Sequence, residues 1–450
     1  MKAILKALTI AGSDSGGGAG IQADLKTFSA VGVFGSSVIT SVTSQNSTGV
    51  LSSYDLPEEI IASQLQTVLS DGKTRAVKIG MLGNGVIVGC VASMLKKKRI
   101  KNVVLDPVIK SSSGRTLLSK EGIEELKSRL LPLALLVTPN LAEAQILSGI
   151  RIARPSDRLK SAKIILKTGV RAVLIKGGHA RGDADDFFYD GKRLEIMKSP
   201  RLCKEDIHGT GCVLASAIAG NLAIGNDLLT AVQSAKSFMG DAIKSAIFPG
   251  DGIACVQPLA GLYRNNNQWN LFQRTSLAIE KLKKARIGNL IPEVQSNLGV
   301  GLENASTLED VIGIPGRIIK QGSDIITLKP PTFGGSRHVA DIVLTVMKHD
   351  PNKTAVMNIK YNDKLLVVCK KLKLRIASFD RKEEPKKIQI REGSSLEWGT
   401  DNAIRHHGCV PDIIYDLGGF GKEEMIRVIA PDVEALVNRV LKIHNMYRKT

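Results

Sequence analysis

Two glycine-containing segments in the first 260 residues bring flexible backbone next to side chains that could do chemistry. The first contains Gly16, Gly17, Gly18 and Gly20, directly ahead of a predicted helix. Backbone N–H groups at such a helix start can bind an anion. The segment matches neither the P-loop pattern nor the dinucleotide-binding GxGxxG pattern. It therefore indicates either a ligand-binding loop or a tight turn between a strand and a helix.

The second segment runs from His208 to Cys212 and leads into an apolar helix expected at residues 213–222. Its middle residues are Gly209, Thr210 and Gly211. Their backbone N–H groups and the positive end of the helix dipole could stabilise negative charge on a transferred phosphoryl group. In the first turn of the helix Cys212 is expected to have a lowered thiol pKa, as a general base near neutral pH requires. The alternative is that Cys212 is a small core residue.

The last 175 residues contain weaker candidates. Arg317 ends a Gly-Ile-Pro-Gly-Arg turn and could hold a diphosphate through two parallel hydrogen bonds. His338 follows two glycines and a serine-arginine pair, and it could donate to the same leaving group or move a proton. Each residue alone is more often a surface contact. The glycine-rich residues 418–422 could be a phosphate-binding turn or an ordinary turn.

The elements that must position these residues follow from short apolar runs. Runs rich in Val, Ile and Leu occur at residues 7–11, 76–79, 102–105, 135–138 and 172–175. Continuous apolar runs are typical of strands buried on both faces, which indicates a parallel sheet covered by helices. Ligands of such sheets bind beyond the carboxyl ends of the strands. The polar residues that follow each run are therefore the candidate site residues.

The length of 450 residues predicts two or three domains. Polar residues 264–268 mark a domain seam, after which a helix is expected at residues 275–285. We expect an N-terminal α/β domain at residues 1–257, a linker at 258–275 and a smaller C-terminal α/β domain at 276–450. Strands at 354–359 and 365–368 and a terminal helix at 433–445 are expected in the last of these.

The net charge of +19 divides into +10 for residues 1–260 and +9 for residues 261–450, without a dedicated basic arm. This even distribution disfavours nucleic acid and suits small anionic substrates. The six cysteines form no CxxC pair, which indicates reduced thiols. The first residues show no signal peptide, and no apolar stretch approaches the ~18 residues that span a bilayer. We therefore expect a cytoplasmic protein without a membrane or nucleic-acid partner, with a homo-oligomer as one option.

Seven ordered segments carry a family resemblance. They lie at residues 9–26, 43–46, 78–82, 105–108, 138–143, 176–179 and 208–212. With them, residues 1–257 resemble the hydroxymethylpyrimidine/phosphomethylpyrimidine kinases of thiamine biosynthesis (the ThiD family), in the ribokinase-like superfamily. The resemblance implies a mostly parallel sheet flanked by helices and two ATP-dependent phosphorylations of an aminopyrimidine.

The resemblance also implies roles for individual residues. The aminopyrimidine would be held by Gly12, Asp24, Gln45 and Met81. Mg²⁺ and its waters would be organised by Asp106, Asn140 and Glu143. The ATP phosphates would face Lys176, Gly209, Thr210 and Gly211. Cys212 would activate the hydroxymethyl or phosphate oxygen.

Segments at residues 297–299, 309–317, 334–338, 356–361 and 412–423 resemble the ThiN family of thiamine-phosphate synthases. The resemblance implies condensation of the pyrimidine diphosphate with a thiazole phosphate, with Arg317 and His338 as the catalytic residues. The expected partners are therefore small molecules: an aminopyrimidine, ATP and a thiazole phosphate. Two alternatives stay open, namely a ligand-sensing C-terminal domain and a pyridoxal-type kinase.

Overall fold

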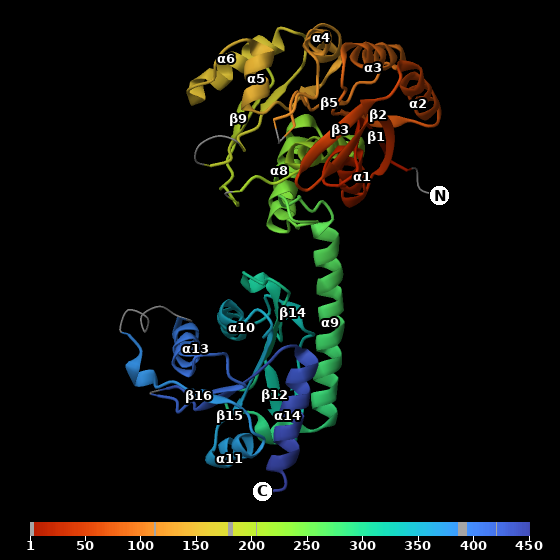
Figure 1. The fold of residues 1–450 in the computed structure, drawn as a ribbon. Helices are drawn as coiled ribbons and strands as arrows, with labels where there is room; N and C mark the ends of the chain where they lie inside the picture. Colours follow the sequence, from red (N-terminus) through yellow and green to blue (C-terminus); the bar gives the residue numbers. More distant parts are fainter. Residues whose placement is uncertain (1–3, 112–113, 179–182, 204, 386–393, 420) are drawn as a thin grey trace. The chain divides into compact units, whose positions relative to one another are not determined.

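The computed structural model describes residues 4–111, 114–178, 183–203, 205–385, 394–419 and 421–450 (Figure 1). His179 and Phe420, which belong to segments named above, lie outside the described residues. The chain divides into two compact units, Met1–Tyr263 and Arg264–Thr450. This division falls within residues 258–275, which the sequence predicted as a linker.

The described residues of the first unit form a nine-stranded sheet in the order β3-β2-β1-β4-β5-β6-β7-β8-β9. The strands are β1 (Lys6–Asp14), β2 (Phe34–Asn46), β3 (Gly49–Asp55), β4 (Thr74–Ile79), β5 (Val103–Leu105), β6 (Leu136–Val137), β7 (Val173–Ile175), β8 (Asp186–Tyr189) and β9 (Leu194–Met197). The six strands β2, β1, β4, β5, β6 and β7 pair in parallel. At the two ends of the sheet, β3, β8 and β9 pair antiparallel with their neighbours. All five predicted strands are confirmed, as β1, β4, β5, β6 and β7.

Helices cover both faces of this sheet (Figure 1). They are α1 (Gly20–Ala30), α2 (Glu58–Ser70), α3 (Gly85–Lys98), α4 (Lys120–Glu125), α5 (Leu141–Ser148), α6 (Pro155–Leu166), α7 (Thr210–Ile224) and α8 (Leu228–Lys244), with the short segments η1 (Leu126–Leu130) and η2 (Leu131–Leu133). Leu8 and Ile10 of β1 pack with α2, α3, α5 and α6, whereas Ala7 packs with α1, α7 and α8. This alternation is the strand periodicity of two.

Helix α7 is apolar around its whole circumference, and every residue from Val213 to Ala223 is buried. A helix with this pattern must lie inside the domain, and α7 contacts α1, α8 and strands β1, β4 and β5. The predicted helix at residues 213–222 is thus confirmed. Its burial fixes the first turn, which carries Gly211 and Cys212, against the sheet.

The described residues of the second unit form a seven-stranded sheet in the order β14-β11-β10-β15-β18-β17-β16 and a small β12-β13 hairpin. The strands are β10 (Leu298–Gly301), β11 (Val311–Gly313), β12 (Ile318–Gln321), β13 (Asp324–Thr327), β14 (Thr332–Phe333), β15 (Ala355–Lys360), β16 (Ile376–Ser378), β17 (Ile413–Asp416) and β18 (Met425–Ala430). Only β16 and β17 pair in parallel among the described strands of this sheet.

Helices also cover both faces of the second sheet, which makes this unit α/β as predicted. The helices are α9 (Ala260–Lys284), α10 (Arg337–His349), α11 (Asp363–Lys371), α13 (Ser394–His407) and α14 (Val433–Tyr447), with η3 (Ile287–Leu290), η4 (Leu308–Asp310) and η5 (Arg381–Glu383). One face packs against α10 and α13, and the other against α9, α11 and α14. The terminal helix at 433–445 is confirmed as α14.

Two local predictions were wrong. Residues 365–368 form part of helix α11 instead of a strand, because Leu365, Val368 and Cys369 lie on one buried helical face and Asn362 caps the helix. The helix expected from residue 275 begins at Ala260, because the asparagine-rich stretch continues the helix. No helix in the described part of the chain is long and apolar enough to cross a membrane.

Candidate functional site

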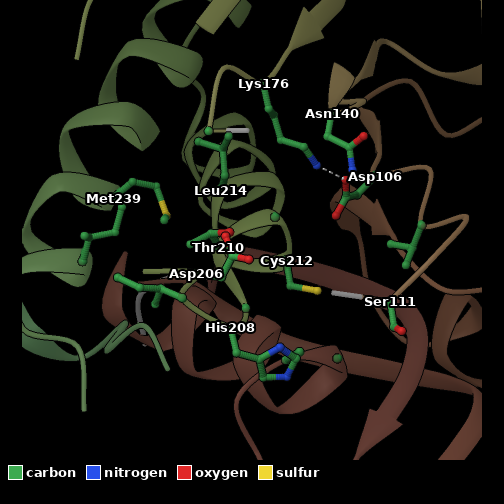
Figure 2. Close-up of a pocket in the computed structure, with 18 of the residues that line it drawn as sticks. Asp106, Ser111, Asn140, Lys176, Asp206, His208, Thr210, Cys212, Leu214 and Met239 are labelled. Carbon is green, nitrogen blue, oxygen red and sulfur yellow. Dashed lines mark hydrogen bonds and ion pairs between the residues drawn. The ribbon is translucent and has the colours of Figure 1, made fainter. Parts of the chain in front are cut away.

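A cavity of about 320 Å³ lies at the carboxyl ends of the parallel strands in the first unit (Figure 2). Residues that end or follow six successive strands of the sheet, from β2 through β1, β4, β5 and β6 to β7, line it, as expected for ligands of a parallel sheet. Eleven of the twelve residues predicted for this unit line the cavity: Gly12, Gln45, Met81, Asp106, Asn140, Glu143, Lys176, Gly209, Thr210, Gly211 and Cys212. The sheet therefore gathers the separate sequence motifs into one site.

Asp24 is the predicted residue that does not line the cavity. Its side chain is fully buried, and it forms an ion pair with the equally buried Lys78 at 2.7 Å. The hydroxyl groups of Thr9 and Ser216 donate to the same carboxylate at 2.6 and 2.7 Å. The expected direct contact between Asp24 and a ligand does not fit this placement. Asp24 instead joins α1 to β1, β4 and α7 behind the cavity wall.

Replacing Asp24 with Asn is expected to destabilise the first unit by about 3–5 kcal/mol, because the Lys78 ammonium would stay buried without its counter-ion. The midpoint and slope of the urea unfolding transition of the full chain would measure this loss. Glu124→Gln is the control, because Glu124 belongs to an exposed ion pair with Lys127 and should cost less than about 1 kcal/mol. A loss for Asp24→Asn as small as that of the control would contradict the argument.

A second charged cluster lines the cavity, where Lys176, Asp106 and Asn140 lie close together (Figure 2). Lys176 Nζ is 2.6 Å from Asp106 Oδ1 and 4.0 Å from Glu143 Oε2. Asn140 and Glu143 form a capping box at the start of α5, in which Asn140 Oδ1 accepts from the Glu143 N–H and Glu143 Oε2 accepts from the Asn140 N–H. The first turn of α5 therefore fixes Glu143 beside Lys176.

Lys176 and Asp106 act on the Glu143 carboxyl group in opposite directions in this cluster. Burial raises the pKa of Glu143 to about 7; Lys176 opposes this rise and Asp106 adds to it. Burial alone would lower the pKa of Lys176, but Asp106 and Glu143 raise it overall. The ammonium is thus held charged between two carboxyl groups.

The same two carboxylates fit a Mg²⁺ ion better than a transition metal. No group of three His, Cys, Asp or Glu side chains among the described residues could hold a metal ion alone. Mg²⁺ typically takes one or two carboxylates and completes its shell with water and substrate phosphate. The pKa of Glu143 is raised mainly by burial, and a cation beside this carboxyl group would favour its ionised form. Asn140 is less suited as a ligand, because its Oδ1 already caps α5.

The start of helix α7 faces this cluster through its glycines. Gly209 has φ of +86°, and a Cβ there would lie 2.0 Å from the Gly18 carbonyl oxygen. A Cβ on Gly211 would lie 3.2 Å from both Asp106 Oδ2 and Lys176 Nζ. Glycine at these positions therefore lets the first turn of α7 approach the charged cluster. The free N–H groups of that turn carry partial positive charge.

Cys212 lies in this first turn, as predicted, but its pKa moves in the opposite direction. Burial raises the pKa of the Cys212 thiol to about 11; Lys78 opposes the rise, and Asp24 and Asp106 add to it. The Gly20 N–H also hydrogen-bonds to the sulfur and favours the thiolate. The expectation of a lowered pKa was wrong, because desolvation and two carboxylates outweigh the helix dipole and the lysine. Cys212 is a protonated thiol at neutral pH in this state.

The glycine-rich loop at residues 15–20 holds itself together. The Asp14 carboxylate accepts hydrogen bonds from the N–H groups of Gly16, Gly18 and Ala19 at 2.8, 3.1 and 2.8 Å. His208 Nε2 lies 3.3 Å from the same carboxylate. Burial would raise the pKa of Asp14, but these hydrogen bonds lower it overall. Of the two interpretations of this loop, the structure favours a closed turn in which these three N–H groups already have an acceptor.

Gln45 and Met81 also line the cavity. Gln45 Nε2 lies 2.8 Å from His208 Nε2, so the amide is held in place by the imidazole. A Cβ on Gly12 would lie 3.1 Å from the Met81 sulfur. The absence of a side chain at Gly12 therefore leaves Met81 in contact with the backbone at the end of β1.

The two predicted side chains of the second unit come from adjoining loops at one edge of its sheet. Arg317 follows β11, and His338 lies at the start of α10, after β14. Gly313 pairs with Thr332, and a Cβ on Gly313 would lie 3.1 Å from Ser336 Cβ. The loops that carry Arg317 and His338 therefore lie against each other, and both side chains are exposed to solvent.

In the turn around residues 418–422, the N–H groups of Gly418, Gly419 and Lys422 already have acceptors. The Gly419 and Lys422 N–H groups donate to each other's carbonyl oxygens at 3.0 and 2.9 Å. The Gly418 N–H donates to Asp416 Oδ1 at 3.0 Å. Of the two interpretations of this turn, the structure favours the ordinary one.

Comparisons with known proteins assign both units. A phosphomethylpyrimidine kinase family model matches residues 14–257, and a model of the thiamine-phosphate synthase ThiN matches residues 276–442. A bifunctional thiamine biosynthesis protein ThiDN of Methanocaldococcus jannaschii is 35% identical over 445 residues, which cover 98% of this chain and 98% of that protein. The chain belongs to the ThiDN family of bifunctional thiamine biosynthesis enzymes. The predicted kinase and synthase activities are thereby confirmed.

Other relatives match the kinase domain but not the synthase domain. A hydroxymethylpyrimidine/phosphomethylpyrimidine kinase of Rhizobium meliloti is 48% identical over 242 residues, 53% of this chain and 91% of that protein. Among solved structures, a Bacillus subtilis pyridoxal kinase in an ADP complex is 36% identical with a TM-score of 0.54, covering 58% of this chain and 99% of that chain. The predicted ribokinase-like fold of the kinase domain is confirmed.

Sequence reasoning missed several residues of the kinase domain that shape the site. Lys78 stands inside an apolar strand, and a charged residue there must have a buried partner, which was an available signal. Asp14 ends β1 just before the glycines, where aspartate often accepts hydrogen bonds from the following N–H groups. Nothing in the sequence pairs His208 with Gln45, because the two residues meet only in the folded sheet.

Proposed function

We propose that the kinase cavity binds the aminopyrimidine beside Gln45, Met81 and Gly12, and the ATP phosphates beside Lys176 and the first turn of α7. An amide such as that of Gln45 can both donate to and accept from the ring nitrogens and amino group of an aminopyrimidine. Apolar side chains of Leu214 and Met239 line the side of the cavity away from Asp106 (Figure 2). These features suit a cavity with one polar wall for phosphate and one apolar wall for a base.

One observation carries this proposal: the Lys176–Asp106 pair, the α7 N-terminus and the Cys212 thiol border a single cavity. The hydroxymethyl oxygen would attack the γ-phosphorus, forming an O–P bond while the bond to the β-phosphate oxygen breaks. Lys176 and the backbone N–H groups of residues 209–211 would stabilise the charge on the transferred group. The hydroxyl proton would pass to the Cys212 thiolate. The second phosphorylation would use the same groups, with a phosphate oxygen as the nucleophile.

Asp106 and Glu143 would hold Mg²⁺ beside Lys176. When bound, this ion supplies positive charge to the ATP phosphates. Asn140 would act indirectly, because its side chain fixes the position of Glu143 through the capping box. Lys176, already placed between the two carboxylates, would turn its ammonium toward the phosphate once the ion shares the carboxylate charge.

Replacing Glu143 with Gln is expected to stabilise the ligand-free enzyme at pH 8 while impairing the kinase. The folded-state pKa of about 7 lies above the unfolded value of 4.5, so the folded state binds more protons and its stability falls as pH rises from 4.5 through 7. A neutral amide avoids this loss, on the order of 1–3 kcal/mol.

Thermal unfolding at pH 5 and pH 8 would measure the stability effect, which should vanish at pH 5. Kinase assays across Mg²⁺ concentrations should show at least a tenfold higher Mg²⁺ requirement. Equal stabilisation at both pH values would contradict the titration argument, and an unchanged Mg²⁺ requirement would contradict the metal assignment.

In the synthase domain, we propose that Arg317 and His338 bind the diphosphate leaving group of the activated pyrimidine. Their adjoining loops at the sheet edge, and their exposure, support this assignment. The thiazole nitrogen would displace diphosphate at the pyrimidine methylene carbon. Binding of the departing charge by an arginine fork and an imidazole lowers the barrier to this step.

The decisive assay supplies the full chain with ATP, Mg²⁺, hydroxymethylpyrimidine and thiazole phosphate. Thiamine phosphate should form, and it should not form when thiazole phosphate is omitted. Accumulation of the pyrimidine diphosphate alone would contradict the synthase assignment. Faster phosphorylation of pyridoxal than of hydroxymethylpyrimidine would favour the pyridoxal-type alternative, to which the similarity with a pyridoxal kinase gives some support.

A further inference from the structure

Arg317 stands at the end of a turn whose backbone is tightly specified. The Arg317 N–H donates to the Ile314 carbonyl oxygen at 3.2 Å and closes a turn with Pro315 and Gly316 in the middle. Gly316 has φ of +80°, and Arg317 itself has φ of +72°. A non-glycine residue in this left-handed region is uncommon and persists when its surroundings hold it there. The question is which groups hold this turn.

The side chain of Asn297, just before β10, holds both peptide groups of Ile314. Its Oδ1 accepts from the Ile314 N–H at 3.0 Å, and its Nδ2 donates to the Ile314 carbonyl oxygen at 2.9 Å. Asn297 is only 8% exposed and Ile314 is fully buried, so water does not readily replace these bonds. An asparagine amide can do this because it carries a donor and an acceptor side by side.

Asn297 is itself fixed from the neighbouring strand. Its N–H donates to Asn358 Oδ1 at 2.6 Å, and its carbonyl oxygen accepts from the Asn358 N–H at 3.2 Å. Asn358 lies in β15, at the centre of the sheet. The position of the turn is thereby tied to the central strand of the sheet.

The Arg317 side chain has a separate support. Its Nη1 donates to the Val294 carbonyl oxygen. The N–H groups of Glu293 and Val294 in turn donate to the Glu423 carboxylate at 3.0 and 2.9 Å. A guanidinium has five N–H donors, so this contact aims the group and leaves donors for a ligand.

We propose that Asn297 is a positioning residue for Arg317 in the synthase reaction. Through its two hydrogen bonds, Asn297 fixes the Ile314 peptide groups from which the turn projects the guanidinium. The inference rests on the proposed role of Arg317 at the diphosphate. A small misplacement of a catalytic group can lower a rate about 100-fold. Loss of Asn297 should therefore lower the synthase rate by displacing Arg317, and it should do so only if Arg317 takes part in the reaction.

The test is a double-mutant cycle in the full chain with Asn297→Ala, Arg317→Ala and the double variant. The measured quantities are synthase kcat/KM and the inhibition constant of inorganic diphosphate, with urea unfolding of the full chain as the folding control for the second unit. We expect Asn297→Ala to lower synthase kcat/KM by about 10- to 100-fold and to raise the inhibition constant. In the Arg317→Ala background the same change should alter kcat/KM less than about twofold, since coupled residues are not additive.

Asn362→Ala is the matched control. Asn362 caps α11 and donates to Tyr447 Oη at 2.9 Å, so its loss also removes side-chain hydrogen bonds from the same domain. Its effect on kcat/KM should stay within about twofold and should multiply with that of Arg317→Ala. If Asn297→Ala does not fold, Asn297→Asp replaces it in the cycle, because it keeps the acceptor but cannot donate to the Ile314 carbonyl oxygen.

Two results would overturn the inference while leaving the proposed function intact. One is synthase activity within about twofold of wild type after the Asn297 change, and the other is a loss that multiplies fully with that of Arg317→Ala. If Arg317→Ala alone leaves the synthase unchanged, the proposed site fails and the inference fails with it.

Discussion

Replacement of Cys212 by alanine is expected to lower the kinase rate by about 10²–10⁴-fold, the usual contribution of a general base. The substrates should still bind, because Gln45 and Lys176 are untouched, so the loss should fall on kcat more than on KM. Steady-state kinetics with hydroxymethylpyrimidine and with its monophosphate would measure both steps. Cys90→Ala is the matched control, because Cys90 lies in α3, outside the residues that line the cavity.

The raised thiol pKa gives this prediction a pH signature. Only the thiolate accepts a proton. The pKa of the thiol is about 11, so at lower pH the thiolate fraction rises about tenfold with each unit by which the pH is raised. The wild-type kinase kcat/KM should therefore rise with a slope near one between about pH 7.5 and 9.5. The Cys212→Ala enzyme should show no such rise. A flat wild-type profile, or a full rate in Cys212→Ser, would rule out Cys212 as the base.

Replacement of Arg317 by alanine is expected to lower synthase kcat/KM by about 10²–10³-fold, because the departing diphosphate loses a charge-assisted contact. The kinase rate of the same protein should be unchanged. Arg317→Lys should recover little activity, since an ammonium cannot form two parallel hydrogen bonds. Thiamine phosphate formation from purified pyrimidine diphosphate would isolate this step from the kinase.

Arg286→Ala is a demanding control for Arg317. Arg286 is also an exposed arginine of the second unit with positive φ, of +54°, and it pairs with Asp324 at 2.7 Å. It shares the unusual backbone and the surface charge of Arg317 but not its place at the sheet edge. If both variants lose the same activity, the effect comes from the fold of the domain and the diphosphate assignment is wrong.

The parallel sheet made most of the kinase site predictable. Asp106, Asn140 and Lys176 each follow a short apolar run, and runs of that kind become adjacent strands whose carboxyl ends share one edge. The order of these residues in the sequence therefore predicted that their side chains would lie together at the carboxyl edge of the sheet. The strand predicted at residues 365–368 was wrong because four apolar residues fit a strand or a buried helix face equally well. Asn362, which caps the helix, was the signal that favoured a helix.

The burial of Asp24 and the raised pKa of Cys212 were not predicted, for a different reason. Two of the partners of Asp24, Lys78 and Ser216, lie 54 and 192 residues away in the chain. No local pattern reports such distant contacts. A position in the first turn of a helix does lower the pKa of a thiol, but the pKa of Cys212 depends on all the groups around it. Here the carboxylates of Asp24 and Asp106 and the loss of water oppose the rule.

The hydrogen bonds from residues 16, 18 and 19 to the Asp14 carboxylate close the glycine-rich loop and affect the kinetics and entropy of ligand capture. A glycine-rich loop that wraps a phosphate must lose backbone freedom on binding, at about 1–2 kcal/mol per residue that becomes ordered. In this enzyme Asp14 already holds Gly16, Gly18 and Ala19 through hydrogen bonds, so this loss occurs during folding. The substrate meets a rigid surface, so its capture needs little rearrangement and its selection depends on shape instead of on loop closure.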